Sequence, residues 1–161
     1  MIATSQELAA IHAQAVRDYP HESCGIILLR GAERRLMPCR NIQEELHAQD
    51  PARHPRDART AYHIDPQDLL KIGRLEGEGF AVAVIYHSHI DAGAYFSETD
   101  RRQALFGDEP MYPEATYIVA SVRGGADGPA VDDTAAFRWD PQRRDFPRVD
   151  LGEAAIRGGV Q

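Results

Sequence analysis

The feature that most constrains the fold is a run of seven apolar residues at positions 80–86, Phe-Ala-Val-Ala-Val-Ile-Tyr. A run this short and this rich in β-branched residues predicts a strand, and its lack of apolar and polar alternation indicates burial on both faces. A strand buried on both faces lies in the middle of a sheet and needs further layers above and below it. The neighbouring segments must therefore supply helices and partner strands.

Those neighbouring segments do show both kinds of pattern. Helices are predicted at 5–18, where Thr4 and Glu7 have capping-box spacing, and at 66–77, where Asp65 precedes a proline. A third helix is expected at 97–106, with Ser97 as its N-cap. Further strands are expected at 24–30, 34–40, 116–122 and 134–139. Helices and strands alternate, so the sequence predicts an α/β (α+β) fold with a sheet covered by helices.

The composition is that of one ordinary globular domain. The chain has 161 residues, 43% of them hydrophobic and 27% charged, which argues against disorder and coiled coils. The 18 basic residues are scattered among 25 acidic ones for a net charge of -7, so neither nucleic acid nor an anionic membrane is an expected partner. No apolar run approaches the roughly 20 residues of a membrane span, and no leader pattern is visible, so we expect a cytoplasmic protein with Cys24 and Cys39 reduced.

One segment, 43–60, has no helical or strand period. It is polar, contains two prolines and three arginines, and is therefore predicted to be a long loop inserted into the domain. Loops of this length in compact domains are often functional, which makes it a candidate lid. The alternative interpretation is an ordered surface insertion with no chemical role.

The candidate chemistry lies directly after the central strand. The period of two in a strand puts His87 and His89 on the same side of the backbone. Asp100 follows in the first turn of the helix that Ser97 would cap, from where its carboxylate can turn back toward the strand. Two histidines and one carboxylate are a typical ligand set for catalytic zinc, with a fourth position left for water. The sequence therefore predicts one zinc ion per chain, with a bound water.

The full pattern resembles that of a known family. Pro20-x-Glu22-x-Cys24-Gly25, followed by His87-Ser88-His89-x7-Ser97-x-x-Asp100, resembles the JAMM motif of the MPN+ (Mov34/JAB) metalloprotease family. The resemblance implies a single MPN, cytidine-deaminase-like domain over residues 1–140, with a mixed sheet flanked by helices, and a partly disordered extension at 141–161. It further implies that His87, His89 and Asp100 bind zinc, that Glu22 is the general acid/base, and that Ser97 stabilises the oxyanion.

Two positions depart from the family pattern. Many members have proline directly after the second histidine and directly before the serine, whereas this chain has Ile90 and Phe96. These prolines shape the loop and ligate nothing, so the ligands are retained. The spacing, together with Ala94 and Tyr95, is most similar to the small bacterial members that stand alone.

That branch implies a substrate. Its members act on ubiquitin-like sulfur-carrier proteins that end in Gly-Gly, so we expect a peptidase or isopeptidase that cleaves the amide after that glycine, for example releasing cysteine during cysteine biosynthesis. A glycine tail suits a narrow groove, because only glycine lets the backbone approach a metal closely. Two alternatives stay open: a zinc hydrolase that acts on another ubiquitin-like conjugate or on a small substrate, and a non-catalytic MPN scaffold. A homodimer is compatible with the sequence.

The remaining candidates are weaker. Cys24 lies in an apolar run, where a thiol behaves as a small hydrophobic group rather than a nucleophile. His21 is interpreted as a surface residue rather than a fourth ligand, and Tyr95 and Phe96 could either contact a peptide or pack the loop. The C-terminal Arg157-Gly158-Gly159 resembles a carrier tail and could enter a neighbouring active site. Four further histidines have no ligand-like spacing: His12, His47, His54 and His63.

Overall fold

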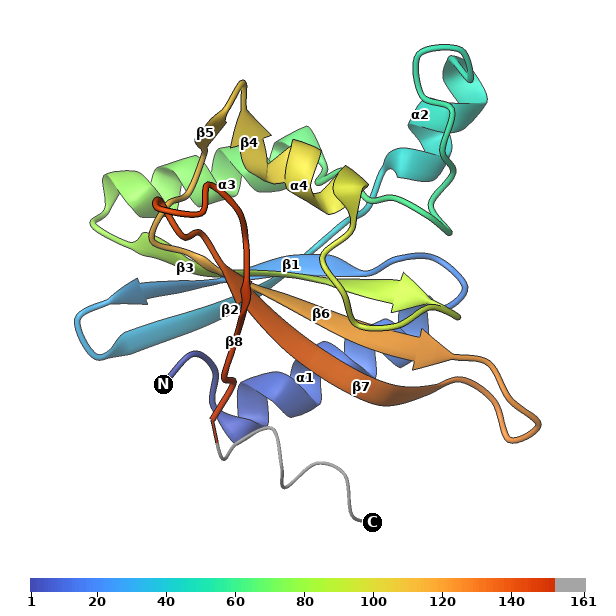
Figure 1. Cartoon of the computed structure of the whole chain (residues 1–161), viewed down its shortest axis with the longest axis horizontal. Coiled ribbons are helices and arrows are strands. Elements are labelled where there is room, and N and C mark those ends of the chain that lie inside the picture. The colour runs from blue at the N-terminus through green and yellow to red at the C-terminus, as the bar shows by residue number, and fades with distance from the viewer. Residues whose placement is uncertain (153–161) are drawn as a thin grey trace.

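A computed structural model describes residues 1–152 as a mixed sheet with helices on both faces (Figure 1). The six-stranded sheet has the order β2-β1-β3-β6-β7-β8. Within it β3 and β6 run parallel, and the other neighbouring pairs are antiparallel. The predicted fold class, α/β with a mixed sheet, is therefore confirmed. The strands are β1 (Cys24–Arg30), β2 (Glu33–Cys39), β3 (Ala81–Ile90), β6 (Thr116–Arg123), β7 (Ala130–Arg138) and β8 (Arg148–Val149).

Strand β3 occupies the middle of this sheet, as its apolar sequence predicts. It is longer than expected, because its pairing with β6 continues from Val84 opposite Thr116 to Ile90 opposite Val122. His87 and His89 therefore lie within the strand rather than after its end. Ladder hydrogen bonds fix their positions more firmly than a loop could.

Helices cover the two faces of the sheet. Helix α1 (Ser5–Asp18) packs on one face, and its capping box of Thr4 and Glu7 is formed as predicted. Helices α3 (Pro66–Gly77) and α4 (Glu98–Ala104) lie on the opposite face in Figure 1. Helix α4 ends two residues before the expected 106, because the chain there enters a small ribbon of β4 (Leu105–Phe106) and β5 (Glu109–Pro110).

A close approach between neighbouring strands explains Gly25 of the motif. The ring of Tyr86 on β3 lies directly over Gly25 on β1, and a Cβ at that position would meet the phenol oxygen at 2.2 Å. The hydroxyl of Tyr86 donates to Gln14 Oε1 at 2.5 Å, and Gln14 Nε2 donates to the carbonyl of Cys24 at 2.9 Å. A residue without a side chain is thus needed for α1, β1 and β3 to pack together.

The expected loop at 43–60 is partly helical, which corrects the prediction. Residues Gln43–Gln49 form α2, although the segment shows no clear helical period. The helix is a single short one with Gln43 as its buried residue, so it leaves little amphipathic signal in the sequence.

The chain after residue 140 also contributes to the sheet. Strand β8 pairs with β7, Ala136 opposite Val149, so part of the expected extension at 141–161 belongs to the sheet. Cys24 and Cys39 face each other across β1 and β2 as free thiols. The Arg157-Gly158-Gly159 tail lies outside the described residues. Within residues 1–152, no helix is long and apolar enough to cross a membrane.

Candidate metal centre and active site

The three predicted metal ligands meet near the end of β3. His87 and His89 point to the same side of the strand, and Asp100 projects from the first turn of α4. Asp100 Oδ1 lies 3.0 Å from His87 Nε2, and Asp100 Oδ2 lies 3.1 Å from His89 Nε2. Each residue offers one potential ligand atom, and these three atoms all lie within 4.8 Å of one another. All three side chains are buried. The structure thus brings together the residues that the spacing singled out.

The hydrogen bonding of the two histidines fits a metal. Both ring nitrogens of the fully buried His87 lack a hydrogen-bond partner among the described residues, so the short contact of its Nε2 with Asp100 does not have hydrogen-bond geometry. Buried polar atoms normally have partners, and a nitrogen without one is suited to donate its lone pair to a cation. His89 Nδ1 lies 2.8 Å from the Gly93 carbonyl, which only accepts, so Nδ1 carries the proton and Nε2 faces the cluster.

Asp100 is held in place by the cap of its own helix. Its backbone N–H donates to Ser97 Oγ at 3.0 Å, and its Oδ2 accepts from the Ser97 N–H at 2.9 Å. Burial raises the pKa of Asp100, but the adjacent imidazoles of His87 and His89 outweigh that effect and hold the pKa well below its usual value. Asp100 is therefore a carboxylate with a fixed direction, as a metal ligand must be.

Glu22 is positioned by the segments on both sides of it. Its backbone N–H donates to the carbonyl of Ala58 at 2.8 Å, and its own carbonyl accepts from Asn41 Nδ2 at 2.9 Å. The next residue, Ser23, is bound to Ser88 of β3 by two hydrogen bonds of 2.8 and 3.1 Å. This tie between Ser23 and Ser88 places Glu22 beside the strand that carries the two histidines.

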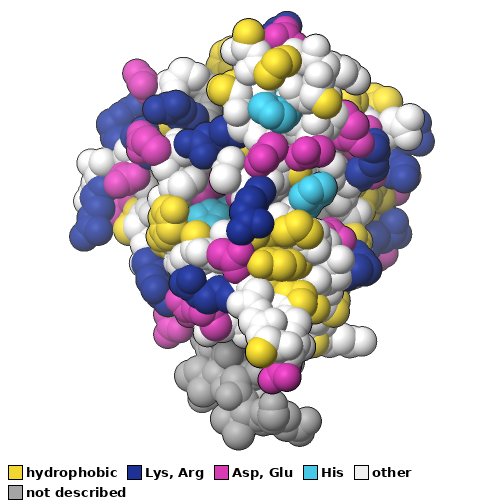
Figure 2. All heavy atoms as spheres, turned by 90° about the vertical axis from the view of Figure 1, so that its right-hand side faces the viewer, with side chains coloured by type: hydrophobic (Ala, Val, Ile, Leu, Met, Phe, Trp, Pro, Cys, Tyr) yellow, Lys and Arg dark blue, Asp and Glu magenta, His cyan; other side chains and the backbone are white. Residues whose placement is uncertain are grey.

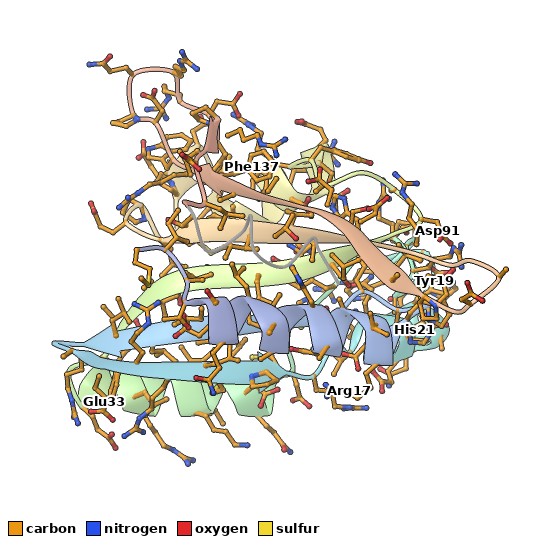
Figure 3. The ribbon with its side chains drawn as sticks, turned by 90° about the horizontal axis from the view of Figure 1, so that it is seen from below. Arg17, Tyr19, His21, Glu33, Asp91 and Phe137 are labelled. Atoms are coloured by element: carbon orange, nitrogen blue, oxygen red, sulfur yellow. The ribbon has the colours of Figure 1, made fainter. Side chains whose placement is uncertain are left out.

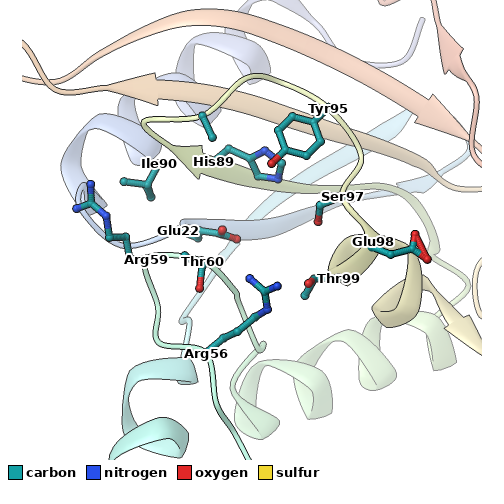
Figure 4. Close-up of a pocket in the computed structure, with 11 residues that line it drawn as sticks. Glu22, Arg56, Arg59, Thr60, His89, Ile90, Tyr95, Ser97, Glu98 and Thr99 are labelled. Atoms are coloured by element: carbon teal, nitrogen blue, oxygen red, sulfur yellow. The ribbon is translucent and has the colours of Figure 1, made fainter.

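Glu22, His89 and Ser97 line one cavity of about 310 Å³ (Figure 4). The Glu22 carboxyl is buried, and burial together with the negative charge of Asp100 raises its pKa to about 9, while Arg56 acts in the opposite direction. A buried carboxyl with a raised pKa is a strong base when it ionises, which suits proton transfer. The residues predicted from the resemblance to be catalytic thus share a cavity with one predicted ligand.

The opposite side of the cavity comes from residues 56–60, which we call the wall. Arg56, Arg59 and Thr60 line the cavity from this side in Figure 4. The wall is anchored to α2, because the Arg56 carbonyl accepts from Gln43 Nε2 at 2.8 Å and the Ala58 N–H donates to Glu44 Oε2 at 2.9 Å. Part of the segment predicted to be a candidate lid therefore lines the cavity, and the sequence did not indicate which of its residues would do so.

Tyr62 is another site residue that the sequence did not indicate. Its buried ring stacks on the imidazole of His87, with centroids 4.7 Å apart and an interplanar angle of 25°. This contact restricts the rotation of the His87 ring. An isolated tyrosine at the end of a polar segment gives no pattern from which to predict such packing.

The loop between His89 and Ser97 keeps its shape without the family's prolines. Asp91 has a φ of 52°, a left-handed conformation that aspartate tolerates better than most residues. Its carboxylate accepts from the Tyr19 hydroxyl at 2.8 Å, the Gly124 N–H at 2.8 Å and Arg59 Nη2 at 2.7 Å. Figure 3 shows Tyr19 and Asp91 at the same end of the molecule. Polar contacts from three segments thus fix the loop.

The two aromatic residues of that loop have different positions. Phe96 packs in an aromatic cluster with Tyr117, Phe137 and Phe146, with centroid distances of 4.9 to 5.4 Å. Tyr95 is 54% exposed, lines the cavity and meets the ring of His89 edge-on at 4.9 Å. Of the two, only Tyr95 has its side chain exposed at the cavity.

Other candidates from the sequence lie outside the cluster. His21 is exposed and lines a separate pocket between α1 and the end of β2. Burial raises the pKa of the Cys24 thiol, which disfavours a thiolate nucleophile, as expected. The metal-ligand group found among residues 1–152 does not include His12, His47, His54 or His63.

The surface around the cavity is mixed in charge. Figure 2 views the side of the molecule that carries α2 and the ends of β3 and β6, and it shows basic and acidic side chains interspersed there. The exposed arginines in this region include Arg56 and Arg59. A continuous basic stripe, the usual feature of a nucleic-acid site, is not visible on this face.

Comparisons with known proteins agree with this geometry. A 94-residue segment is 35% identical to "Tail tip assembly protein K" of Escherichia phage N15, covering 58% of this chain and 32% of the phage protein. The "CysO-cysteine peptidase" of Mycobacterium tuberculosis is 35% identical over 115 residues, 71% of this chain and 68% of that protein. The "Probable TtuB-protein conjugate cleaving protease" of Thermus thermophilus is 34% identical over 98 residues, 60% of this chain and 58% of that protein.

The fold and the family follow from two further matches. The solution structure of a Desulfitobacterium hafniense protein superposes with a TM-score of 0.57 at 19% identity, over 91% of this chain and 88% of that one, which supports the fold. The chain spans about a third of the phage protein and about two thirds of the mycobacterial peptidase. The family model described as prokaryotic homologs of the JAB domain matches residues 4–139, from the cap of α1 to just beyond β7. The chain therefore belongs to the prokaryotic JAB-domain family.

Proposed function

We propose that this protein is a zinc peptidase that cleaves the amide bond after the C-terminal Gly-Gly of a ubiquitin-like sulfur-carrier protein. The observation that carries the proposal is the buried group of His87, His89 and Asp100 beside Glu22, which matches the donor set of a catalytic zinc site. The mycobacterial relative is named for cleaving a cysteine from CysO. We infer from that name that the released residue is an amino acid such as cysteine.

The residues have complementary roles in such a reaction. His87, His89 and Asp100 would hold one zinc ion, which supplies Lewis acidity and lowers the pKa of a bound water to about 7. Glu22 accepts a proton from the attacking water and later delivers it to the leaving amine. The Ser97 hydroxyl accepts from the Asp100 N–H and keeps its own hydrogen available for the oxyanion of the tetrahedral intermediate.

A second candidate function uses the same chemistry on a larger leaving group. The Thermus relative is named for cleaving TtuB from protein conjugates, which favours an isopeptidase that releases a carrier from a lysine side chain. The two functions differ in the leaving group beyond the scissile bond, which is one free amino acid or a whole protein. A non-catalytic scaffold is less well supported, because His87, His89 and Asp100 form a group that could hold a metal ion, and Glu22 lines the cavity beside it.

The test combines metal analysis with a cleavage assay. The zinc content of the purified protein is measured by elemental mass spectrometry. The same protein is then incubated with a carrier that ends in Gly-Gly-Cys. We expect about one zinc per chain, in line with one ligand group, and a mass loss of one cysteine that a chelator abolishes. Zinc binding without cleavage of either this carrier or a lysine-linked conjugate would contradict the proposal.

A further inference from the structure

Arg56 is a cation in the cavity for which residues 1–152 supply no carboxylate partner. Its side chain is exposed and extends from the wall toward Glu22 and Thr99 in Figure 4. Among residues 1–152 no carboxylate lies within ion-pair distance of its guanidinium, whereas the neighbouring Arg59 is paired with Asp91 at 2.7 Å. Of the two arginines that line the cavity, Arg56 is therefore the one with its charge available for a ligand.

The position of Arg56 is fixed although its side chain is exposed. Its carbonyl is held by Gln43 Nε2, and the wall is bound to Glu44 and to the backbone of Glu22 through Ala58. Arg56 lines the same cavity as Glu22 and Ser97, so its guanidinium lies beside the groups proposed to react. An anchored backbone next to the site lowers the entropy cost of directing this long side chain at a substrate.

The proposed substrate carries a matching anion. When one amino acid follows Gly-Gly, its α-carboxylate is only two bonds from the scissile nitrogen. A guanidinium binds a carboxylate through two parallel hydrogen bonds, with both charge and geometry matched. A lysine-linked conjugate offers no such carboxylate, because the amine of the leaving group is at the end of a long aliphatic side chain.

We propose that Arg56 binds the α-carboxylate of the residue that is released, and so makes this enzyme select carriers that end one amino acid after Gly-Gly. This inference rests on the proposed peptidase function and identifies the α-carboxylate as the substrate group that the cavity recognises. Arg56 is then a specificity-determining residue that favours trimming over deconjugation.

The experiment compares two carriers that differ in one group. Both end in Gly-Gly-Cys under reducing conditions, one with a free carboxylate and one with a C-terminal carboxamide, and kcat/KM is measured for each by mass spectrometry. We expect the wild-type protein to prefer the carboxylate by roughly 10- to 100-fold, the contribution of a charged hydrogen-bonded pair. In Arg56→Met this ratio falls close to one, and in Arg56→Lys it is intermediate. The control Arg53→Met, in the same segment but outside the cavity lining, keeps the wild-type ratio.

The outcomes separate this inference from the proposed function. Equal cleavage of both carriers by the wild-type protein would overturn the role of Arg56 while leaving the peptidase intact. A loss of rate in Arg56→Met on both carriers with an unchanged ratio would also overturn it, since Arg56 would then act through Glu22. If the wild-type protein cleaves neither carrier, the proposed function fails and this inference fails with it. Zinc content measured on every variant shows whether the metal site is intact.

Discussion

The two sides of the cavity are built in different ways. On one side, Glu22 and His89 line the cavity, and His87 and Asp100 belong to the same buried ligand group as His89. We call these four residues the floor, and each is at most 5% exposed. On the other side, the wall exposes the side chains of Arg56 and Arg59 and is anchored through backbone hydrogen bonds.

Because of this difference, we expect catalysis and substrate selection to depend on different residues. A buried group of charged side chains tolerates few substitutions, because each change leaves a partner without its contact. Exposed side chains on an anchored backbone can change without a comparable cost to the fold. We therefore expect floor variants to lose the reaction and wall variants to change which substrates are used.

Removal of a ligand from the floor should have the largest effect. In His89→Ala the cluster keeps two donors, too few for a catalytic zinc site, so zinc content should fall and turnover should drop by about 10³-fold or more. Metal analysis and kcat/KM on the Gly-Gly-Cys carrier measure both. His63→Ala, which changes an exposed histidine outside the cluster, is the matched control. Full activity of His89→Ala without zinc would show that the floor is not a metal site.

Neutralising Glu22 should separate metal binding from proton transfer. Glu22→Gln keeps the shape of the side chain and leaves the three ligands in place, so zinc content should stay at the wild-type level. Turnover should fall by about 10²- to 10⁴-fold, the usual contribution of a general base. The same metal and cleavage assays apply, and a variant that retains turnover would rule out Glu22 as the base.

Ser97 is both the N-cap of α4 and the proposed hydrogen-bond donor to the oxyanion, and two substitutions separate these roles. Ser97→Gly removes the hydroxyl but costs only a few tenths of a kcal/mol as an N-cap, whereas Ser97→Thr keeps both the cap and the hydroxyl. If the hydroxyl stabilises the oxyanion, Ser97→Gly should lower kcat by about 10²-fold with a small change in melting temperature. Ser97→Thr should stay near wild type. Equal turnover in the two variants would show that Ser97 acts only as a helix cap.

The floor was largely predictable from the sequence, for a physical reason. Seven apolar residues in a row indicate the central strand, and its period of two puts His87 and His89 on one side. Ser97 and Asp100 are three residues apart because a capping box requires that spacing, and the structure forms this box. The position of Glu22 depended on the family pattern, since a carboxylate before a strand has no local signature of its own.

The wall was not predictable at the level of single residues. Its place in space depends on Gln43 and Glu44 of α2, which bind backbone groups more than a dozen residues away, at Arg56 and Ala58. Contacts between side chains and distant backbone leave no period in the sequence, so the pattern at 43–60 predicts only a loop. Tyr62 gives no signal for the same reason, because its partner His87 is distant in the sequence.

Asp91 connects the floor and the wall of the cavity, and its substitution should have the smallest effect on activity. Through its carboxylate it holds the loop that follows His89 and, by way of Arg59, the wall. Asp91→Ala removes these contacts at a left-handed position, so we expect kcat/KM to fall roughly three- to tenfold through loss of alignment, with zinc retained. Asp91→Asn still tolerates the conformation and can accept from Gly124, so its loss should be smaller.

Arg59→Met completes that test, because it breaks the tie to the wall while the contacts of Asp91 with Tyr19 and Gly124 remain. If the wall depends on this ion pair, we expect Arg59→Met and Asp91→Ala both to weaken the preference for the free carboxylate. Both variants should then raise KM more than they lower kcat. If Asp91→Ala lowers kcat and Arg59→Met changes nothing, Asp91 serves the floor alone, and the anchoring of the wall is due to α2. Steady-state kinetics of the two variants on the carboxylate and carboxamide carriers decide between these cases.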